Sequence, residues 1–193
     1  HAYDITYWTV ERHKDQLVVI DDSIVRGTTL KRSILRILDR LDPKRIVVVS
    51  SAPQIRYPDC YGIDMAKMGD FIAFQAAIAL HKERGNEALI ETVYNACIEE
   101  LKKPFAEQGN MVKPIYENLT PEETSDKISA LLTPANMKAE VKIIYQGIQG
   151  LHAAIPNHKG DWYFTGDFPT PGGNRVVNRA FVFWKEGRTK RAY

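Results

Sequence analysis

Apolar positions near the start of the chain predict a strand, a helix and a second strand. The segment Gln16–Asp22 contains the unbroken apolar run Leu17–Ile20, which is typical of a strand buried on both faces of a parallel sheet. From Leu30 to Leu41, apolar side chains recur with the 3.6-residue period of a helix. Ile46–Val49 repeats the buried-strand pattern. This order predicts a βαβ unit with a right-handed crossover.

The rest of the chain has mainly helical patterns. Helical spacing covers residues 68–84 and 89–101, and a third helix begins at the capping box Thr120–Glu123. Residues 141–145 predict a short strand, and residues 176–184 fit either a strand or a helix. Residues 147–175 are rich in Gly, Pro and aromatic residues, which predicts loops and turns. The fold class is therefore α/β, a Rossmann-like parallel sheet with a mainly helical C-terminal extension.

Composition excludes several classes of protein. The 193 residues are 44% hydrophobic and 26% charged, which is ordinary for a globular protein and argues against disorder. No apolar run approaches the ~20 residues of a membrane span, and a net charge of +2 does not suggest nucleic-acid binding. Two cysteines cannot build a disulfide scaffold, so we expect a reducing compartment, the cytoplasm.

The chemistry concentrates in the stretch that follows the first predicted strand. Asp21 and Asp22 stand where that strand reaches the carboxyl edge of the sheet, the edge at which open α/β folds bind ligands. Gly27 lets the backbone approach a ligand closely. Thr28 and Thr29 stand at a helix N-terminus, which they can cap and which favours an anion. Carboxylates beside an anion site suit a sugar phosphate.

The whole stretch, from Val18 to Thr29, resembles the phosphoribosyl pyrophosphate loop of the type I phosphoribosyltransferase family. Its residue sequence is most similar to that of the glutamine-dependent branch of this family. Two later segments resemble the same branch: Ser51–Pro58 with the following Tyr61–Met65, and Tyr163–Thr170 near the end. The motifs occur in the right order over most of the chain, which makes the resemblance specific.

The resemblance implies roles for individual residues. Asp21 and Asp22 would be the catalytic acids that face the ribose hydroxyls and contribute to a Mg²⁺ site. The substrate-binding loop would wrap the 5-phosphate with backbone amides and threonine hydroxyls; it comprises Ser23, Ile24, Val25, Arg26, Gly27, Thr28 and Thr29. The chemistry agrees, because carboxylates stabilise the positive charge that develops on the ribose when pyrophosphate leaves.

The resemblance also implies a reaction, partners and a division of the chain. Phosphoribosyl pyrophosphate, glutamine and water would give 5-phosphoribosylamine, glutamate and pyrophosphate, the first step of de novo purine synthesis. Residues 1–66 would be the C-terminal part of the transferase domain and residues 67–193 a helical extension. The glutaminase domain that binds glutamine would be absent, leaving this piece inactive alone. Purine nucleotides would be feedback ligands of a homo-oligomer, with no nucleic acid or membrane as partner.

We expect no iron–sulfur cluster, although some members of the branch hold one through cysteines. Cluster irons need thiolates, normally four. Asp59, Gly160 and Tyr163 stand where the resemblance places cluster cysteines, and no cysteine follows Cys97. We expect the aromatic residues around Tyr163 to hold the C-terminal segment by packing instead.

Other interpretations stay open. Asp21 and Asp22 could be solvated acids at a strand end, Tyr61–Asp64 is more simply a structural turn, and Cys60 and Cys97 are more simply inert thiols. The chain could instead come from a nucleobase or orotate phosphoribosyltransferase. It could also come from a non-enzymatic relative that senses purines, although no helix-turn-helix pattern is evident.

Overall fold

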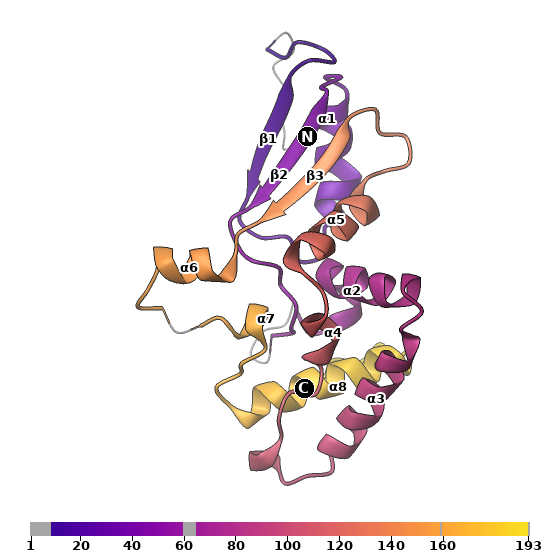
Figure 1. The fold of residues 1–193 in the computed structure, drawn as a ribbon, viewed down its shortest axis with the longest axis vertical. Helices are drawn as coiled ribbons and strands as arrows, with labels where there is room; N and C mark the ends of the chain where they lie inside the picture. The colour runs from indigo at the N-terminus through magenta and orange to yellow at the C-terminus, as the bar shows by residue number, and fades with distance from the viewer. Residues whose placement is uncertain (1–8, 60–64, 159, 193) are drawn as a thin grey trace.

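The computed structural model describes residues 9–59, 65–158 and 160–192. Its described strands form one parallel sheet in the order β1-β2-β3, with β1 at Gln16–Asp21, β2 at Arg45–Ser50 and β3 at Glu140–Tyr145 (Figure 1). In the strand register, Asp21 lies beside Ser50 and Ser50 beside Tyr145. The α/β class and the three predicted strands are confirmed.

Helices form the connections between the strands and the C-terminal half of the chain. The first crossover begins as a π-helix at Leu30–Ile34 and continues as α1 at Leu35–Asp39. Between β2 and β3 lie α2 (Ile72–Glu83), α3 (Glu87–Glu100), α4 (Pro114–Glu117) and α5 (Pro121–Leu132), with short 3₁₀ turns at Met68–Asp70 and Phe105–Glu107. After β3 come α6 (Ile148–Ala154), α7 (Trp162–Thr165) and α8 (Pro171–Lys185).

The predicted helices are confirmed, one open alternative is decided, and one expectation is wrong. The capping box of α5 is present, because Thr120 and Glu123 each accept a hydrogen bond from the other's backbone N–H. Residues 176–184 are helical, within α8. The prediction of only loops and turns over residues 147–175 is wrong, because α6, α7 and the first turn of α8 lie there. The last of these starts at Thr170-Pro171, where Thr170 caps and Pro occupies the first helical position.

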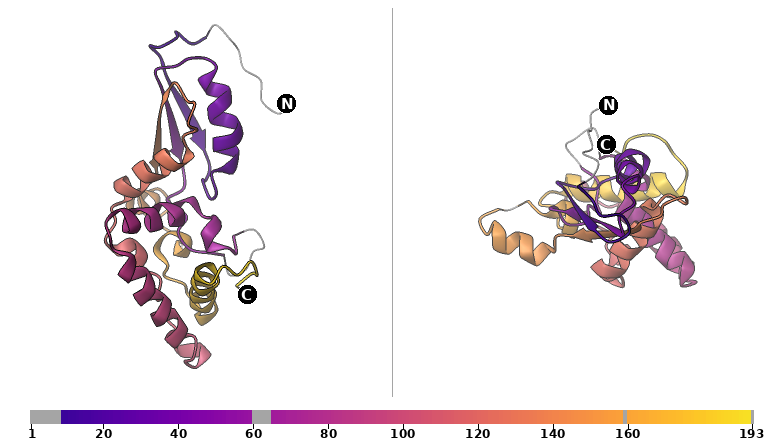
Figure 2. Two further views of the ribbon diagram at one scale, coloured as in Figure 1. Left: turned by 90° about the vertical axis from the view of Figure 1, so that its right-hand side faces the viewer. Right: turned by 90° about the horizontal axis from the view of Figure 1, so that it is seen from above.

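One face of the sheet is covered and the other is open. Leu35 of α1, Ala76 of α2 and Ile128 of α5 share a core with Ile46, Val48 and Ile143 of the strands, and Figure 2 (left) shows α1 on this side. On the opposite face, Val18 is 64% exposed, Ile20 78% and Ile144 42%. The prediction that β1 is buried on both faces is therefore wrong, because the described helices that contact the sheet all pack on one side.

Helix α2 joins the sheet core to a second core in the helical half of the molecule. Its Ala73 and Ala76 pack in the sheet core, whereas Phe74 and Ile78 belong to the second core. There the ring of Phe74 meets Trp184 of α8 edge-on, with 4.7 Å between ring centroids. Because α2 is buried on two sides, its sequence is apolar almost throughout.

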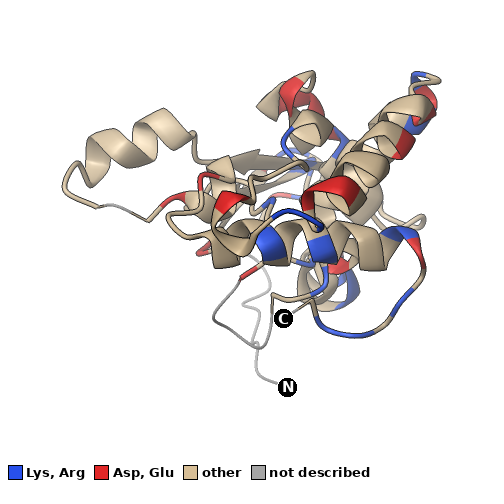
Figure 3. Ribbon diagram, turned by 90° about the horizontal axis from the view of Figure 1, so that it is seen from below, with Lys and Arg blue, Asp and Glu red and all other residues tan. Residues whose placement is uncertain are grey.

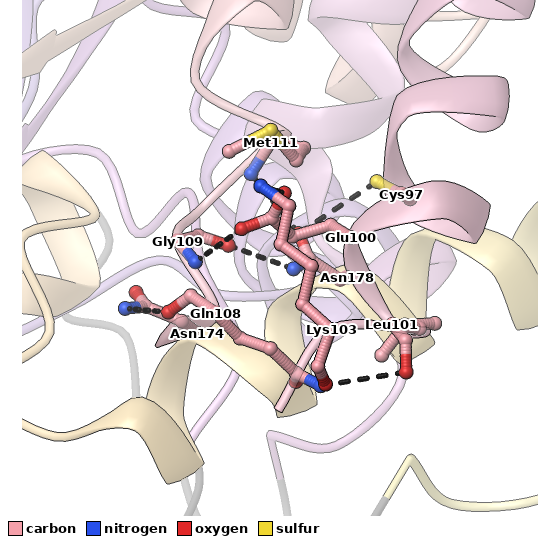
Figure 4. Close-up of polar contacts among 9 residues, drawn as sticks. All are labelled: Cys97, Glu100, Leu101, Lys103, Gln108, Gly109, Met111, Asn174 and Asn178. Atoms are coloured by element: carbon pink, nitrogen blue, oxygen red, sulfur yellow. Dashed lines mark hydrogen bonds and ion pairs between the residues drawn. The ribbon is translucent and has the colours of Figure 1, made fainter. Parts of the chain in front are cut away.

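A buried polar cluster holds the loop between α3 and α4 against α8 (Figure 4). The Asn178 amide accepts a hydrogen bond from Met111 N at 3.0 Å and donates one to Gly109 O at 2.8 Å. Glu100, also buried, accepts from Gly109 N at 2.7 Å and pairs with Lys103 at 2.6 Å. This loop is therefore fixed by polar contacts that no apolar pattern in the sequence reveals.

Lys and Arg as well as Asp and Glu occur along the described helices at the helical end, while α6 contains none of these four residue types (Figure 3). Among the described helices, none is long and apolar enough to cross a membrane. The predicted division at residue 66 stays a prediction. The sheet takes its third strand, β3, from beyond that boundary.

Candidate functional site

The two predicted acids lie at the carboxyl end of β1, where the strand passes into the loop. Ser51 N donates to Asp21 O at 2.9 Å and Ala52 N to Asp22 O at 3.0 Å. These bonds tie the loop after β1 to the loop after β2, the segment that begins the second family motif. The backbone that carries both carboxylates is therefore held from the neighbouring strand.

The carboxyl groups of Asp21 and Asp22 lie close to each other. Burial raises the pKa of Asp21, and the hydrogen-bonding contact and charge of the Asp22 carboxyl raise it further. Two carboxylates at short range repel, and a proton or a cation between them relieves the repulsion. The site can therefore attract positive charge at the edge of the sheet.

The loop after the acids is anchored through its side chains and carbonyl groups. Ile24 is buried in the sheet core, and Val25 O accepts a hydrogen bond from Ile72 N, at the start of α2, at 2.8 Å. Gly27 has a φ of +66°, and a Cβ there would lie 2.6 Å from the methyl carbons of Leu132. Glycine is thus required at this position both by conformation and by space.

The end of the loop leads into the helix of the first crossover. Gly27 O accepts the first helical hydrogen bond, from Lys31 N at 2.9 Å. Thr29 makes no side-chain capping bond within the described chain, so the expected threonine cap is not formed there. Thr28 and Thr29 are exposed at a helix N-terminus, where backbone N–H groups and the helix dipole favour an anion. Arg26 points to Asp70, with 3.8 Å between charged atoms.

The donor set fits Mg²⁺ as a partial shell. The described residues contain no group of three or more His, Cys, Asp or Glu side chains that could hold a metal. Mg²⁺ commonly binds one or two carboxylates together with substrate phosphates and water. The close Asp21 and Asp22 carboxyls supply the protein part of such a shell, and the ligand would have to supply the rest.

The structure brings the second and third family motifs into contact, although they are more than a hundred residues apart. Tyr163 O accepts hydrogen bonds from Arg56 N at 2.9 Å and from Tyr57 N at 3.1 Å, and the Tyr163 hydroxyl donates to Asp59 at 3.1 Å. Gly166, with a φ of +76°, packs against the ring of Tyr57. Sequence reasoning identified both segments but not that they pair.

Sequence reasoning missed a cleft of about 680 Å³ beyond the end of β2 and beside β3. Gln54 and Arg56 line one part of it, and Lys142, Tyr145 and Gln146 another. Gln54 and Arg56 belong to the second motif, but nothing in the sequence placed them beside Lys142, Tyr145 and Gln146, because that proximity depends on the long connection between β2 and β3.

Of the predicted cysteine and turn positions, only Cys97 lies within the described residues. Cys60 and the Tyr61–Asp64 turn lie outside the described residues. Cys97 is fully buried on α3, and burial raises the pKa of its thiol to about 12. Such a thiol is a packing residue rather than a nucleophile.

The fold and the site define a parallel α/β protein in which paired carboxylates, followed by a loop with Gly27, Thr28 and Thr29, lie at the carboxyl edge of the sheet. Comparison with known proteins shows which members of this class the chain is similar to. The chain is 45% identical over 58 residues to an amidophosphoribosyltransferase of Pasteurella multocida and 42% identical over 57 residues to one of Escherichia coli. It is 29% identical over 136 residues to the amidophosphoribosyltransferase of Saccharomyces cerevisiae. The resemblance to amidophosphoribosyltransferases is therefore confirmed.

The matches cover limited parts of both proteins. The bacterial matches span 30% of this chain and 11% of each relative, and the yeast match spans 66% of this chain and 26% of the relative. No family model matches the chain. The chain thus corresponds to about a quarter or less of its curated relatives.

Proposed function

We propose that this chain supplies the phosphoribosyl pyrophosphate site of an amidophosphoribosyltransferase. The protein would transfer ammonia derived from glutamine to C1 of phosphoribosyl pyrophosphate, giving 5-phosphoribosylamine and pyrophosphate. Release of ammonia from glutamine, which also gives glutamate, would belong to another part of the protein. The observation that carries the proposal is the paired Asp21 and Asp22 at the end of β1, followed directly by the anchored loop.

Each part of the site has a role in this reaction. The N–H groups around Gly27 and the hydroxyls of Thr28 and Thr29 would bind the 5-phosphate, since they face a helix N-terminus. The charges of Asp21 and Asp22 would stabilise the positive charge that develops on the ribose as the C1–pyrophosphate bond breaks. When bound, Mg²⁺ would neutralise the departing pyrophosphate. Ammonia is itself the nucleophile, so the site needs no dedicated general base.

The proposal also includes regulatory ligands, an oligomeric state and a cellular compartment. Purine nucleotides would act as feedback ligands, the protein would work as a homo-oligomer in the cytoplasm, and neither nucleic acid nor membrane would be a partner. The feedback ligands and the homo-oligomer follow from the resemblance, and the other expectations follow from composition, charge and hydropathy.

Replacing both acids tests the site. We expect Asp21→Asn with Asp22→Asn to weaken binding of Mg²⁺ and phosphoribosyl pyrophosphate to the chain by more than about tenfold, measured by titration calorimetry. In a full-length protein carrying the same changes, turnover should fall by ~10²–10³. The double change Glu87→Gln with Glu107→Gln removes two exposed charges in the helical half and should leave both quantities unchanged. Normal turnover in the Asp21 and Asp22 variant would refute the proposal, and binding without turnover in the unaltered full-length protein would favour a sensor.

We also propose that the protein holds no iron–sulfur cluster. Asp59 and Tyr163, which stand at positions where the resemblance places cluster cysteines, are joined by a hydrogen bond of 3.1 Å. That side-chain contact, together with the backbone hydrogen bonds to Tyr163 O, joins the same two segments without a metal cluster. Full-length protein purified without oxygen should be colourless. Stoichiometric iron and acid-labile sulfide would contradict this proposal.

A further inference from the structure

One row of residues crosses the carboxyl end of the sheet on its covered face. Asp21, Ser50 and Tyr145 are the last residues of β1, β2 and β3, and the register places them side by side. Only Ser50 of β2 stands between Asp21 and Tyr145. Since adjacent strands lie ~4.8 Å apart, the backbones of Asp21 and Tyr145 are about two strand spacings from each other. All three alternate in phase with Val19, Val48 and Ile143, which belong to or pack against the sheet core. Their side chains therefore point to the same side as the loop that contains Ile24.

The Tyr145 hydroxyl is buried and has no hydrogen-bond partner among the described residues. The Tyr145 ring packs against the sheet core. Ser50, its neighbour in the row, donates its own hydroxyl to Ala52 O at 2.8 Å. Burial raises the pKa of Tyr145, and the charge of Asp21 raises it further. A buried hydroxyl without a partner destabilises the folded state, and a phenylalanine would pack there without that cost.

We propose that Tyr145 is a positioning residue of the phosphoribosyl pyrophosphate site, whose hydroxyl donates a hydrogen bond to the Asp21 carboxylate in the ligand-bound state. Asp21 is the charged member of the row, and a phenol hydroxyl donates a stronger hydrogen bond to an ionised carboxylate than to a neutral acceptor. In the free chain the Asp21 carboxyl contacts Asp22 instead. Binding of the ligand would therefore satisfy a group that folding leaves unsatisfied. This inference rests on the proposed function of Asp21.

The variant Tyr145→Phe separates this role from a structural one. It keeps the ring and removes only the hydroxyl, so the chain should be as stable to urea as the unaltered protein, or more stable. Binding of Mg²⁺ and phosphoribosyl pyrophosphate should weaken by about tenfold or more, because a hydrogen bond to a charged group is lost. Stability and affinity thus change in different directions, which loss of packing cannot produce.

Tyr94→Phe is the matched control. The Tyr94 hydroxyl donates to Glu186 at 3.0 Å in the helical half, far from the loop in sequence and fold. Its removal should lower stability slightly and leave ligand binding unchanged.

The outcomes distinguish the inference from the proposed function. If the unaltered chain binds no Mg²⁺ and phosphoribosyl pyrophosphate, the proposed function of the chain fails and the inference with it. If the unaltered chain binds and Tyr145→Phe binds equally well, the inference alone is overturned. Equal losses of stability and affinity in Tyr145→Phe would also overturn it, because they would show a structural hydroxyl.

Discussion

At the scale of single residues, Asp42 links the stability of the fold to pH. Its carboxyl is buried, accepts a hydrogen bond from Lys138 at 2.7 Å and pairs with Arg12. These two contacts, that of Lys138 first, lower the pKa of Asp42 from 3.8 to about 2. Since the folded chain holds the charged form more strongly than the unfolded chain, this stabilisation is complete above about pH 4. It is lost as the pH falls toward 2.

We therefore predict that Asp42→Asn flattens the decline of the unfolding free energy between pH 4 and pH 2, measured by urea unfolding. Asparagine tolerates the φ of +52° at this position, so the backbone should not change. Asp126→Asn removes an exposed carboxylate on α5 and should leave the decline intact. An unchanged slope in Asp42→Asn would show that other carboxylates carry the whole acid sensitivity.

At the scale of elements, the loop between α3 and α4 depends on Asn178 of α8. Replacement by leucine would leave Met111 N and Gly109 O without their partner in a buried place. We predict that Asn178→Leu lowers the unfolding free energy by ~3 kcal/mol, since each unsatisfied buried group costs ~1–3 kcal/mol. Asn174→Ala, which removes one bond to Gln108 O at a half-buried position of the same helix, should cost less than ~1.5 kcal/mol. Equal effects of the two changes would refute the central role of Asn178.

The elements also show how far sequence reasoning reaches. The strand pattern of Ile46–Val49, the capping box at Thr120 and the acids at the end of β1 were predictable, because each is a local signal. The helix over residues 176–184 was left undecided, because its apolar positions serve a core built by α2 and α3. The contact between Tyr57 and Tyr163 could not be predicted, since it needs the path of the whole chain between them.

The site was predictable in its parts and not in its arrangement. The stretch from Val18 to Thr29 identified the loop through its resemblance to a known family, and the two later motifs made that resemblance specific. Tyr145 carried no such signal: it ends a short strand whose partner is fixed only when β3 joins β2 across the long helical connection. β1 was expected to be covered on both faces because the run Leu17–Ile20 is apolar throughout, and that local pattern does not reveal which distant elements cover the sheet.

At the scale of the whole molecule, the described sheet has one open face with exposed apolar side chains. Val18 and Ile20 of β1, an edge strand of the described sheet, expose most of their side chains on the same face as Ile144 of β3. An exposed apolar face next to an unpaired strand edge promotes association between chains.

We predict that Ile20→Lys reduces self-association in sedimentation experiments and changes the unfolding free energy by less than ~0.5 kcal/mol, because Ile20 is exposed. Gln16→Lys adds the same charge to the same strand but leaves the apolar face intact, so it should reduce association less. If both variants associate as the unaltered chain does, the open face is not the contact, and another surface must hold the copies together.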